Sequence, residues 1–200
     1  TYSDGSYYIE DTTRVSGIKV IPSSNLPSVA LGDRICPEGV ISSDSNGEPV
    51  IYMTSIESQS SGEELKPLGM KCGDVASPIG LDPAGLLVRV TGRVTYKGAY
   101  GEYLYIQDGS ATTTDASGNK GLRIEFSDLA TPLLNEPVAD QYISITGIAG
   151  AIQYGTSTIK VLRPRSDSDC DIISTNAIPT AERAASQWID DNFSSTGSRR

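Results

Sequence analysis

The stretch Tyr7-Tyr8-Ile9-Glu10-Asp11 returns later in the chain as Leu104-Tyr105-Ile106-Gln107-Asp108. A polar loop follows each copy, and after it comes a short apolar stretch that begins with glycine. These stretches are Gly17-Ile18-Lys19-Val20 in the first copy and Gly121-Leu122-Arg123-Ile124 in the second, where the loop is longer. The repeated order of apolar stretch, loop and glycine-led stretch predicts two copies of one structural unit.

The correspondence extends further along the chain at one fixed spacing. Identical residues align in four pairs: Ile35 with Ile143, Gly39 with Gly147, Gly47 with Gly155, and Ile51 with Ile159. We expect Gly39 and Gly147 where a strand bends sharply, because glycine has no Cβ to obstruct the bend. Gly47 and Gly155 are predicted in hairpin turns.

Apolar and polar residues alternate along the second copy, as an antiparallel sheet with one buried face requires. Leu86, Val88 and Val90 share one face, while Arg89 and Thr91 share the other. The alternation predicts five strands, at about 86–96, 102–108, 121–126, 140–150 and 157–163. The predicted fold class is therefore all-β, with each unit closed around a small core.

One part of the second copy resembles a known family. Leu87-Val88-Arg89-Val90-Thr91-Gly92-Arg93-Val94, leading to Tyr105-Ile106-Gln107-Asp108-Gly109, looks like the paired OB-like modules of secreted bacterial proteins. The resemblance covers most of residues 1–172. It implies two tandem five-stranded OB-like β-barrels in an extracellular protein, and it supplies no catalytic residues.

The first copy lacks its first strand. Thr1-Tyr2 corresponds to Thr95-Tyr96, so nothing in the first copy matches Gly85 to Val94. A barrel without that strand exposes two unpaired edges, which native proteins usually protect. Three explanations remain open: the chain is a fragment of a longer protein, another part of this chain fills the gap, or a neighbouring molecule donates a strand. Donation between molecules would be head-to-tail and would produce filaments.

We expect four segments along the chain. They are an incomplete barrel over 1–65, a proline- and glycine-rich linker over 66–84, a complete barrel over 85–172 and a tail over 173–200. The prolines stiffen the linker, so we expect a fixed arrangement of the two barrels.

The tail offers material for an assembly contact. After Pro179 the apolar residues fall at helical spacing, and they include Trp188 and Ile189. The predicted assembly contacts are Thr1, Tyr2, Tyr7, Ile9, Trp188 and Ile189. Two alternatives are a tail helix that folds back on its own barrel, and an extended donor strand over 171–178.

Composition excludes several kinds of chemistry. The sequence has no histidine, which excludes Ser-His-Asp and Cys-His nucleophiles and every zinc site that uses histidine. The net charge of −9 disfavours binding to nucleic acid, because an acidic surface repels phosphates. We therefore predict no enzyme activity, no cofactor and no metal. A calcium site in the 108–119 loop, with Asp115 at its centre, is a weaker alternative.

The sequence holds three cysteines, of which Cys36 and Cys72 are the predicted disulfide pair; buried free thiols are the alternative. No segment reaches the roughly 20 apolar residues that a membrane-spanning helix needs. The chain begins at Thr1 rather than Met, which fits the loss of a signal peptide or a fragment. With the Ser-, Thr- and Gly-rich composition, this predicts an extracellular or cell-surface protein.

Two ligand-related features complete the predictions. Tyr96, Tyr100, Tyr103 and Tyr105 cluster around one hairpin and are a candidate platform for stacking sugars. The alternative is that these tyrosines pack across the sheet. Asn192 lies in an Asn-Phe-Ser pattern and is a candidate N-glycosylation site.

Together these features predict a non-enzymatic extracellular structural protein that self-associates, with strand complementation into the first barrel as the joint of a filament. One alternative is a carbohydrate-binding module that packs against neighbouring domains of a larger secreted protein. A second is an OB-type single-stranded nucleic-acid binder, which would need Arg89, Arg93, Arg123, Arg163 and Arg165 in one groove.

Overall fold

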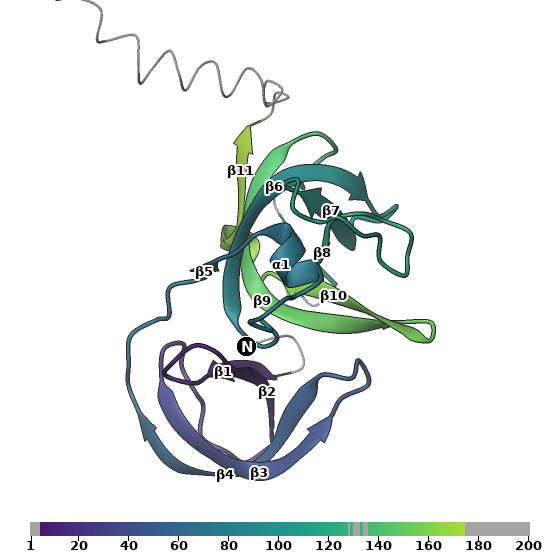
Figure 1. The fold of residues 1–200 in the computed structure, drawn as a ribbon. Helices are drawn as coiled ribbons and strands as arrows, with labels where there is room; N and C mark the ends of the chain where they lie inside the picture. The colour runs from purple at the N-terminus through teal and green to yellow at the C-terminus, as the bar shows by residue number, and fades with distance from the viewer. Residues whose placement is uncertain (1–4, 128, 130–132, 134–135, 175–200) are drawn as a thin grey trace, which may run out of the picture.

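The computed structural model describes residues 5–127, 129, 133 and 136–174, and these residues are mostly β-structure arranged in two sheets (Figure 1). The first sheet has the strand order β1-β2-β4-β3. Its strands are β1 (Tyr7–Glu10), β2 (Gly17–Pro22), β3 (Arg34–Ser43) and β4 (Pro49–Ser60). The all-β prediction is confirmed.

The second sheet has seven strands in the order β11-β9-β10-β8-β7-β6-β5. They are β5 (Leu68–Gly69), β6 (Leu87–Lys97), β7 (Tyr103–Gln107), β8 (Leu122–Glu125), β9 (Tyr142–Tyr154), β10 (Ser157–Arg163) and β11 (Cys170–Ser174). A short helix, α1 (Cys72–Ala76), precedes β6, and a 3-10 turn, η1 (Asp167–Asp169), precedes β11. The five predicted strands correspond to β6 to β10; β5 is not among them, and β11 overlaps the segment 171–178 that the sequence offers only as an extended donor strand.

Five strands of the second sheet form a closed cycle of pairings. β6 pairs with β7 and β9, β7 pairs with β8, β8 pairs in parallel with β10, and β10 pairs with β9. β9 closes the cycle by changing partners along its length, because Ile148 is the residue where its pairing passes from β6 to β10. Beside it, a Cβ added to Gly147 would come within 2.5 Å of the Arg163 carbonyl oxygen. The close approach explains why glycine occupies this point of the strand.

The main core lies inside this cycle. Its fully buried residues come from alternate positions on the five strands, as the apolar-polar alternation predicts. They include Leu86, Val88, Val90, Val94, Leu104, Ile106, Leu122, Ile124, Ile143, Ile145 and Leu162. Helix α1 contributes Cys72 and Val75 to the same cluster.

The first sheet repeats part of the second. Its order β1-β2-β4-β3 matches β7-β8-β10-β9, and the parallel pair β2–β4 matches the parallel pair β8–β10. The registers agree as well, because Tyr8 faces Lys19 across β1 and β2 just as Tyr105 faces Arg123 across β7 and β8. The structure therefore confirms the internal repeat in both topology and register.

The structure changes one part of the sequence alignment. Val20 pairs with Ile51, and the matching residue Ile124 pairs with Leu162, so Ile51 corresponds to Leu162 and not to Ile159. The reason is the hairpin, because Ile41 pairs with Ile51 in the first copy, whereas the matching Ala149 pairs with Leu162 in the second. The arms of the β9–β10 hairpin extend further before their turn, so the second copy has extra residues here and a fixed spacing fails beyond them.

Part of the predicted linker belongs to the second unit. Leu68 and Gly69 pair in parallel with Val88 and Arg89 of β6, and the side chain of Cys72 is fully buried in the core. No helix in the described residues is long and apolar enough to cross a membrane.

Candidate functional site

The first sheet ends in two strands, β1 and β3, that each have one hydrogen-bonded neighbour in the described part of the chain. In the second sheet the matching strands, β7 and β9, are joined by β6, which pairs with both. Within residues 5–127, 129, 133 and 136–174, no strand takes the place of β6 beside β1 and β3. The first sheet is thus the cycle of the second sheet with one strand missing.

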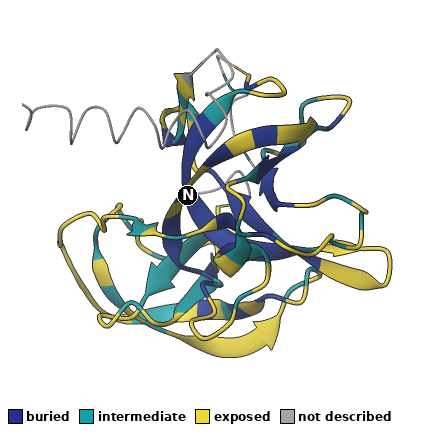
Figure 2. Cartoon of the chain, turned by 45° about the horizontal axis from the view of Figure 1, so that its top comes forward, coloured by how far each residue is buried: buried dark blue, intermediate teal, exposed yellow. Residues whose placement is uncertain are grey.

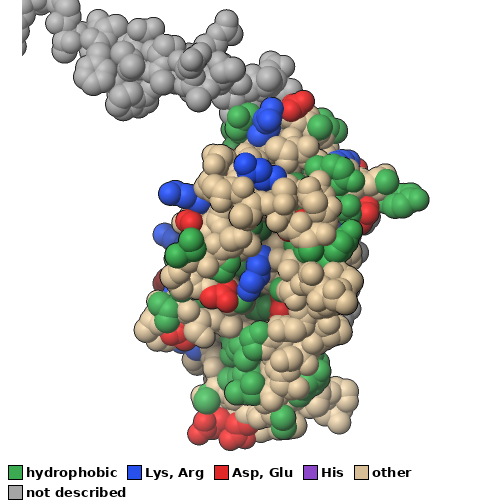
Figure 3. Space-filling view, turned by 45° about the vertical axis from the view of Figure 1, so that its right-hand side comes forward, with side chains coloured by type: hydrophobic (Ala, Val, Ile, Leu, Met, Phe, Trp, Pro, Cys, Tyr) green, Lys and Arg blue, Asp and Glu red, His purple; other side chains and the backbone are tan. Residues whose placement is uncertain are grey.

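The apolar positions beside the gap are uncovered. Ile143 and Ala149 of β9 are 0% and 1% exposed, whereas the matching Ile35 and Ile41 of β3 are half-buried and 73% exposed. Figure 2 shows the same contrast, with β3 largely exposed and the strands of the second sheet largely buried. Figure 3 shows exposed hydrophobic side chains on the lower part of the molecule, the end that the first sheet forms, and on its upper part as well. Uncovered apolar positions between two unpaired edges suit the binding of another strand.

Two of the predicted assembly residues lie at this site. Tyr7 and Ile9 are half-buried on the edge strand β1, and the Tyr7 hydroxyl donates a hydrogen bond to the Met53 sulfur at 3.6 Å. Burial raises the pKa of Tyr7 above its ordinary value. Thr1, Tyr2, Trp188 and Ile189 lie outside the described residues, as does the candidate glycosylation site Asn192.

Three of the four predicted platform tyrosines come together, but one of them is buried. The ring centroids of Tyr96, Tyr103 and Tyr105 are 6.0–6.2 Å apart in stacked and edge-on pairs. The guanidinium of Arg123 lies 3.6 Å from the Tyr103 ring centroid. Tyr105 is fully buried, and Tyr100 is 93% exposed. The tyrosines therefore mainly pack across the sheet, as the alternative interpretation expected.

The loop between β7 and β8 explains the burial of Tyr105. The Tyr105 hydroxyl hydrogen-bonds to Asp115 and, at 2.8 Å, to Ser117. Asp115 also accepts the backbone N–H of Ser117, which makes it a turn-forming residue. The described residues contain no group of three or more His, Cys, Asp and Glu side chains that could hold a metal ion.

Raising the pH is expected to destabilise the protein through Tyr105. Burial raises the pKa of Tyr105 to about 12 in the folded state, whereas a phenol in an unfolded chain has a pKa near about 10. The stability that depends on the neutral phenol is complete below pH 10 and is lost as pH rises toward 12, because the unfolded state ionises first. Urea unfolding across this range checks the prediction. Tyr105→Phe should remove the additional loss, and Tyr100→Phe, at an exposed position, should not; an identical pH slope for all three proteins would contradict it.

A buried charge cluster joins the two sheets. Arg163 on β10 donates to the Glu48 carboxylate at 2.8 Å, and both side chains are about 5% exposed. The same carboxylate accepts hydrogen bonds from the Tyr8 hydroxyl at 2.9 Å and from the backbone N–H of Ala151. Arg163 also donates to the Ala151 carbonyl oxygen at 2.5 Å. A buried pair with its remaining polar atoms satisfied fixes one sheet relative to the other.

A second contact lies at the other end of β1. Glu10 accepts the backbone N–H of Leu87 at 2.6 Å and pairs with Arg14 at 2.9 Å. Arg14 in turn donates to the carbonyl oxygen of Lys66 at 2.5 Å. Gly17 packs directly on the backbone of Gly85, where a side chain on either residue would overlap the other. These contacts join the two sheets through side chains that the sequence does not mark.

The predicted disulfide is not formed, because all three cysteines are free thiols. Cys36 is exposed on β3 and donates a hydrogen bond to Glu57 at 3.2 Å, whereas Cys72 is buried in the core of the other sheet. The two residues belong to different units and cannot meet. Burial raises the pKa of Cys72 to about 12 and that of Cys170 to about 11.

A thiol reagent is expected to modify Cys36 in the folded protein and to leave Cys72 and Cys170 unmodified. Reaction requires an accessible thiolate; Cys72 is buried and Cys170 partly buried, and burial raises the pKa of both thiols so that they stay protonated. Mass spectrometry after alkylation, with and without denaturant, measures this pattern. A disulfide-linked peptide, or rapid modification of Cys72 in the folded state, would contradict it.

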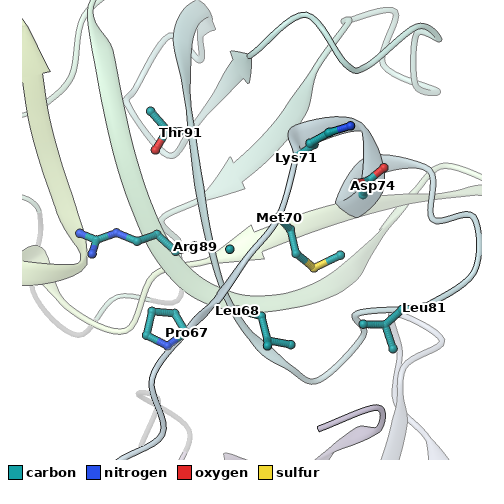
Figure 4. Close-up of a pocket in the computed structure, with 9 residues that line it drawn as sticks. Pro67, Leu68, Met70, Lys71, Asp74, Leu81, Arg89 and Thr91 are labelled. Carbon is teal, nitrogen blue, oxygen red and sulfur yellow. The ribbon is translucent and has the colours of Figure 1, made fainter. Parts of the chain in front are cut away.

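The second unit carries a groove of about 800 Å³ beside the edge strand β5 (Figure 4). Leu68, Met70 and Leu81 gather on one side of it, with Lys71 and Asp74 beyond them at the start of α1. The remaining lining residues are Pro67, Gly69, Arg89 and Thr91. The Arg89 guanidinium pairs with Asp171 of β11 at 2.6 Å. The sequence did not reveal this groove, because the stretch that forms it reads as a linker.

Comparison with known proteins adds little to these observations. No family model matches the chain, and no curated protein is similar to it. Among solved structures, an OBody bound to hen egg-white lysozyme is similar over 57% of this chain and 100% of its own length, at 19% identity and a TM-score of 0.36. A similarity of that extent leaves the fold and the site to be argued from this chain alone.

Proposed function

We propose that this protein is a non-enzymatic extracellular assembly protein whose first sheet accepts a strand from a second copy. The observation that supports the proposal is the gap in the first sheet. β1 and β3 repeat two strands that β6 joins in the second unit, and they have no such partner in the described residues. A strand supplied by a second copy would pair with both edges and would cover Ile35 and Ile41.

The proposal includes the finer description of the fold. We infer an OB-like barrel over residues 85–172 and an incomplete copy over residues 1–65. The cycle β6-β7-β8-β10-β9, with one parallel pair between its third and last strands in sequence, supports a five-stranded Greek-key barrel of this type.

The arrangement of the two units favours a filament. The first sheet lies at one end of the molecule, and β11 lies at the opposite end (Figure 1). The Glu48–Arg163 cluster holds the units in one orientation, so successive joints would repeat the same geometry. A strand donated from the far end of a second copy makes a head-to-tail contact, and such a contact builds a filament when it does not close on itself.

Pairing of the arginines argues against the nucleic-acid alternative. Each of the five arginines that a binding groove would need has a carboxylate partner. These pairs are Arg89–Asp171, Arg93–Asp140, Arg123–Glu125, Arg163–Glu48 and Arg165–Asp169. Phosphates would have to compete with these carboxylates in a protein that already carries a net charge of −9.

The test is size-exclusion chromatography with negative-stain electron microscopy of the purified chain. We expect filaments from the unmodified protein and their loss in Ile41→Lys, which places a charge in the gap without disturbing a buried residue. Tyr100→Lys is the matched control, because Tyr100 is even more exposed but lies in the second unit. A chain that stays monomeric at high concentration would overturn the proposal, as would filaments that form equally well with Ile41→Lys.

A further inference from the structure

The groove beside β5 combines apolar side chains with a lysine whose ammonium has no partner among the described residues. Leu68 and Met70 are half-buried against the core, and Leu81 is 38% exposed above them. Lys71 is exposed, and its side chain forms no hydrogen bond or ion pair with the described residues. The Lys71 ammonium beside these apolar side chains would attract an apolar segment that also carries negative charge.

Strand β11 contacts the lining of this groove and then leads into the chain's own C-terminal segment. Arg89, which lines the groove, is bonded to Asp171, and β11 ends three residues later at Ser174. Residues 175–200 follow, and at roughly 3.3 Å per extended residue they can reach any part of the groove. Because the segment is tethered beside the site, its local concentration there is on the order of millimolar, so even a weak contact is populated.

The segment contains the residues that this groove would bind. Trp188-Ile189-Asp190-Asp191 places two large apolar side chains directly before two carboxylates. The indole and the Ile189 side chain can cover the surface of Leu68, Met70 and Leu81, while the carboxylates approach Lys71.

We propose that the C-terminal segment folds back on its own second unit, with Trp188 and Ile189 in the β5 groove and Asp190 and Asp191 beside Lys71. This inference goes beyond the proposed function and does not depend on it. It holds the tail at the second unit, so the strand that enters the first sheet comes from another part of the second copy.

Trp188 is the single tryptophan of the chain, so its fluorescence reports this contact directly. In dilute monomeric protein we expect blue-shifted emission, protected from acrylamide, that does not change with protein concentration. Leu81→Asp and Lys71→Glu should each shift the emission toward that of the unfolded chain. Loss of one exposed ion pair corresponds to about a fivefold change in the ratio of undocked to docked tail. Lys120→Glu makes the same charge change on an exposed lysine of a distant loop and should have no effect.

Three outcomes would overturn the inference. The first is emission like that of the unfolded chain in the unmodified monomer. The second is a blue shift that appears only as concentration rises, which would place Trp188 on a second copy. The third is loss of filaments when the chain is truncated after Ile178, which would make the tail the donor strand. The third outcome would overturn only the docking of the tail, and the proposed assembly function would stand. If instead Trp188 is docked but no filaments form, only the proposed assembly function fails.

Discussion

Replacing Arg163 with alanine is expected to lower the free energy of unfolding by about 3–5 kcal/mol, the cost of leaving one member of a buried ion pair without its partner. Glu48 would keep its bonds to Tyr8 and Ala151 but would lose the only guanidinium that neutralises it in the junction between the sheets. Water cannot replace that partner without opening the junction, because both side chains are about 5% exposed.

Urea unfolding of the monomer measures this effect. Glu48→Ala should cost a similar amount, and the double variant should cost much less than the two single costs added together, since the second change removes a charge that the first left unpaired. Arg93→Ala is the matched control. Its ion pair with Asp140 is at least half exposed on both sides, so its loss should cost less than about 1 kcal/mol. Equal effects of Arg163→Ala and Arg93→Ala would show that the junction is open to water.

The sequence predicts the strands well because their residues alternate. β6 to β10 fall close to their expected positions, since Leu86, Val88 and Val90 must face one core while Arg89 and Thr91 face away from it. The missing strand was also predictable, because a repeat reveals what one of its copies lacks. The burial of Tyr105 is not predictable in this way, because it depends on a loop whose Asp115 and Ser117 look like ordinary turn residues.

The junction could not be predicted for a different physical reason. Glu48 ends a hairpin turn and Arg163 ends a strand, and in isolation each looks like an exposed charge. Their pairing depends on how two separate units dock, and no local pattern encodes that arrangement. The same holds for β5, because a two-residue strand is too short to show alternation and was assigned to a linker. Short elements and contacts between units therefore remained invisible, and so did the groove that β5 helps to form.

The gap in the first sheet leads to an expected difference between two matching isoleucines. Ile143 and Ile35 occupy equivalent positions on β9 and β3, but only Ile143 is fully buried in the described structure. Ile143→Ala should lower the free energy of unfolding of the monomer by about 2–5 kcal/mol, through lost burial and the cavity that remains. Ile35→Ala should lower it by less, because Ile35 is only half-buried in the monomer and its removal leaves a smaller cavity.

In the assembled protein, Ile35→Ala should have a large effect, in contrast to its smaller effect on the monomer. If a strand from a second copy covers Ile35 as β6 covers Ile143, the side chain becomes core at the joint, and its removal should weaken assembly by an amount close to the cost of Ile143→Ala. Comparing the critical concentration for filament formation of Ile35→Ala with that of the unmodified protein measures this cost, with urea unfolding of each monomer beside it. A large loss of monomer stability in Ile35→Ala would mean that the chain's own residues already fill the gap. An unchanged critical concentration would mean that the joint lies elsewhere. One result for Ile35→Ala supports an acceptor sheet that a second molecule completes: the monomer is stable, but it assembles poorly.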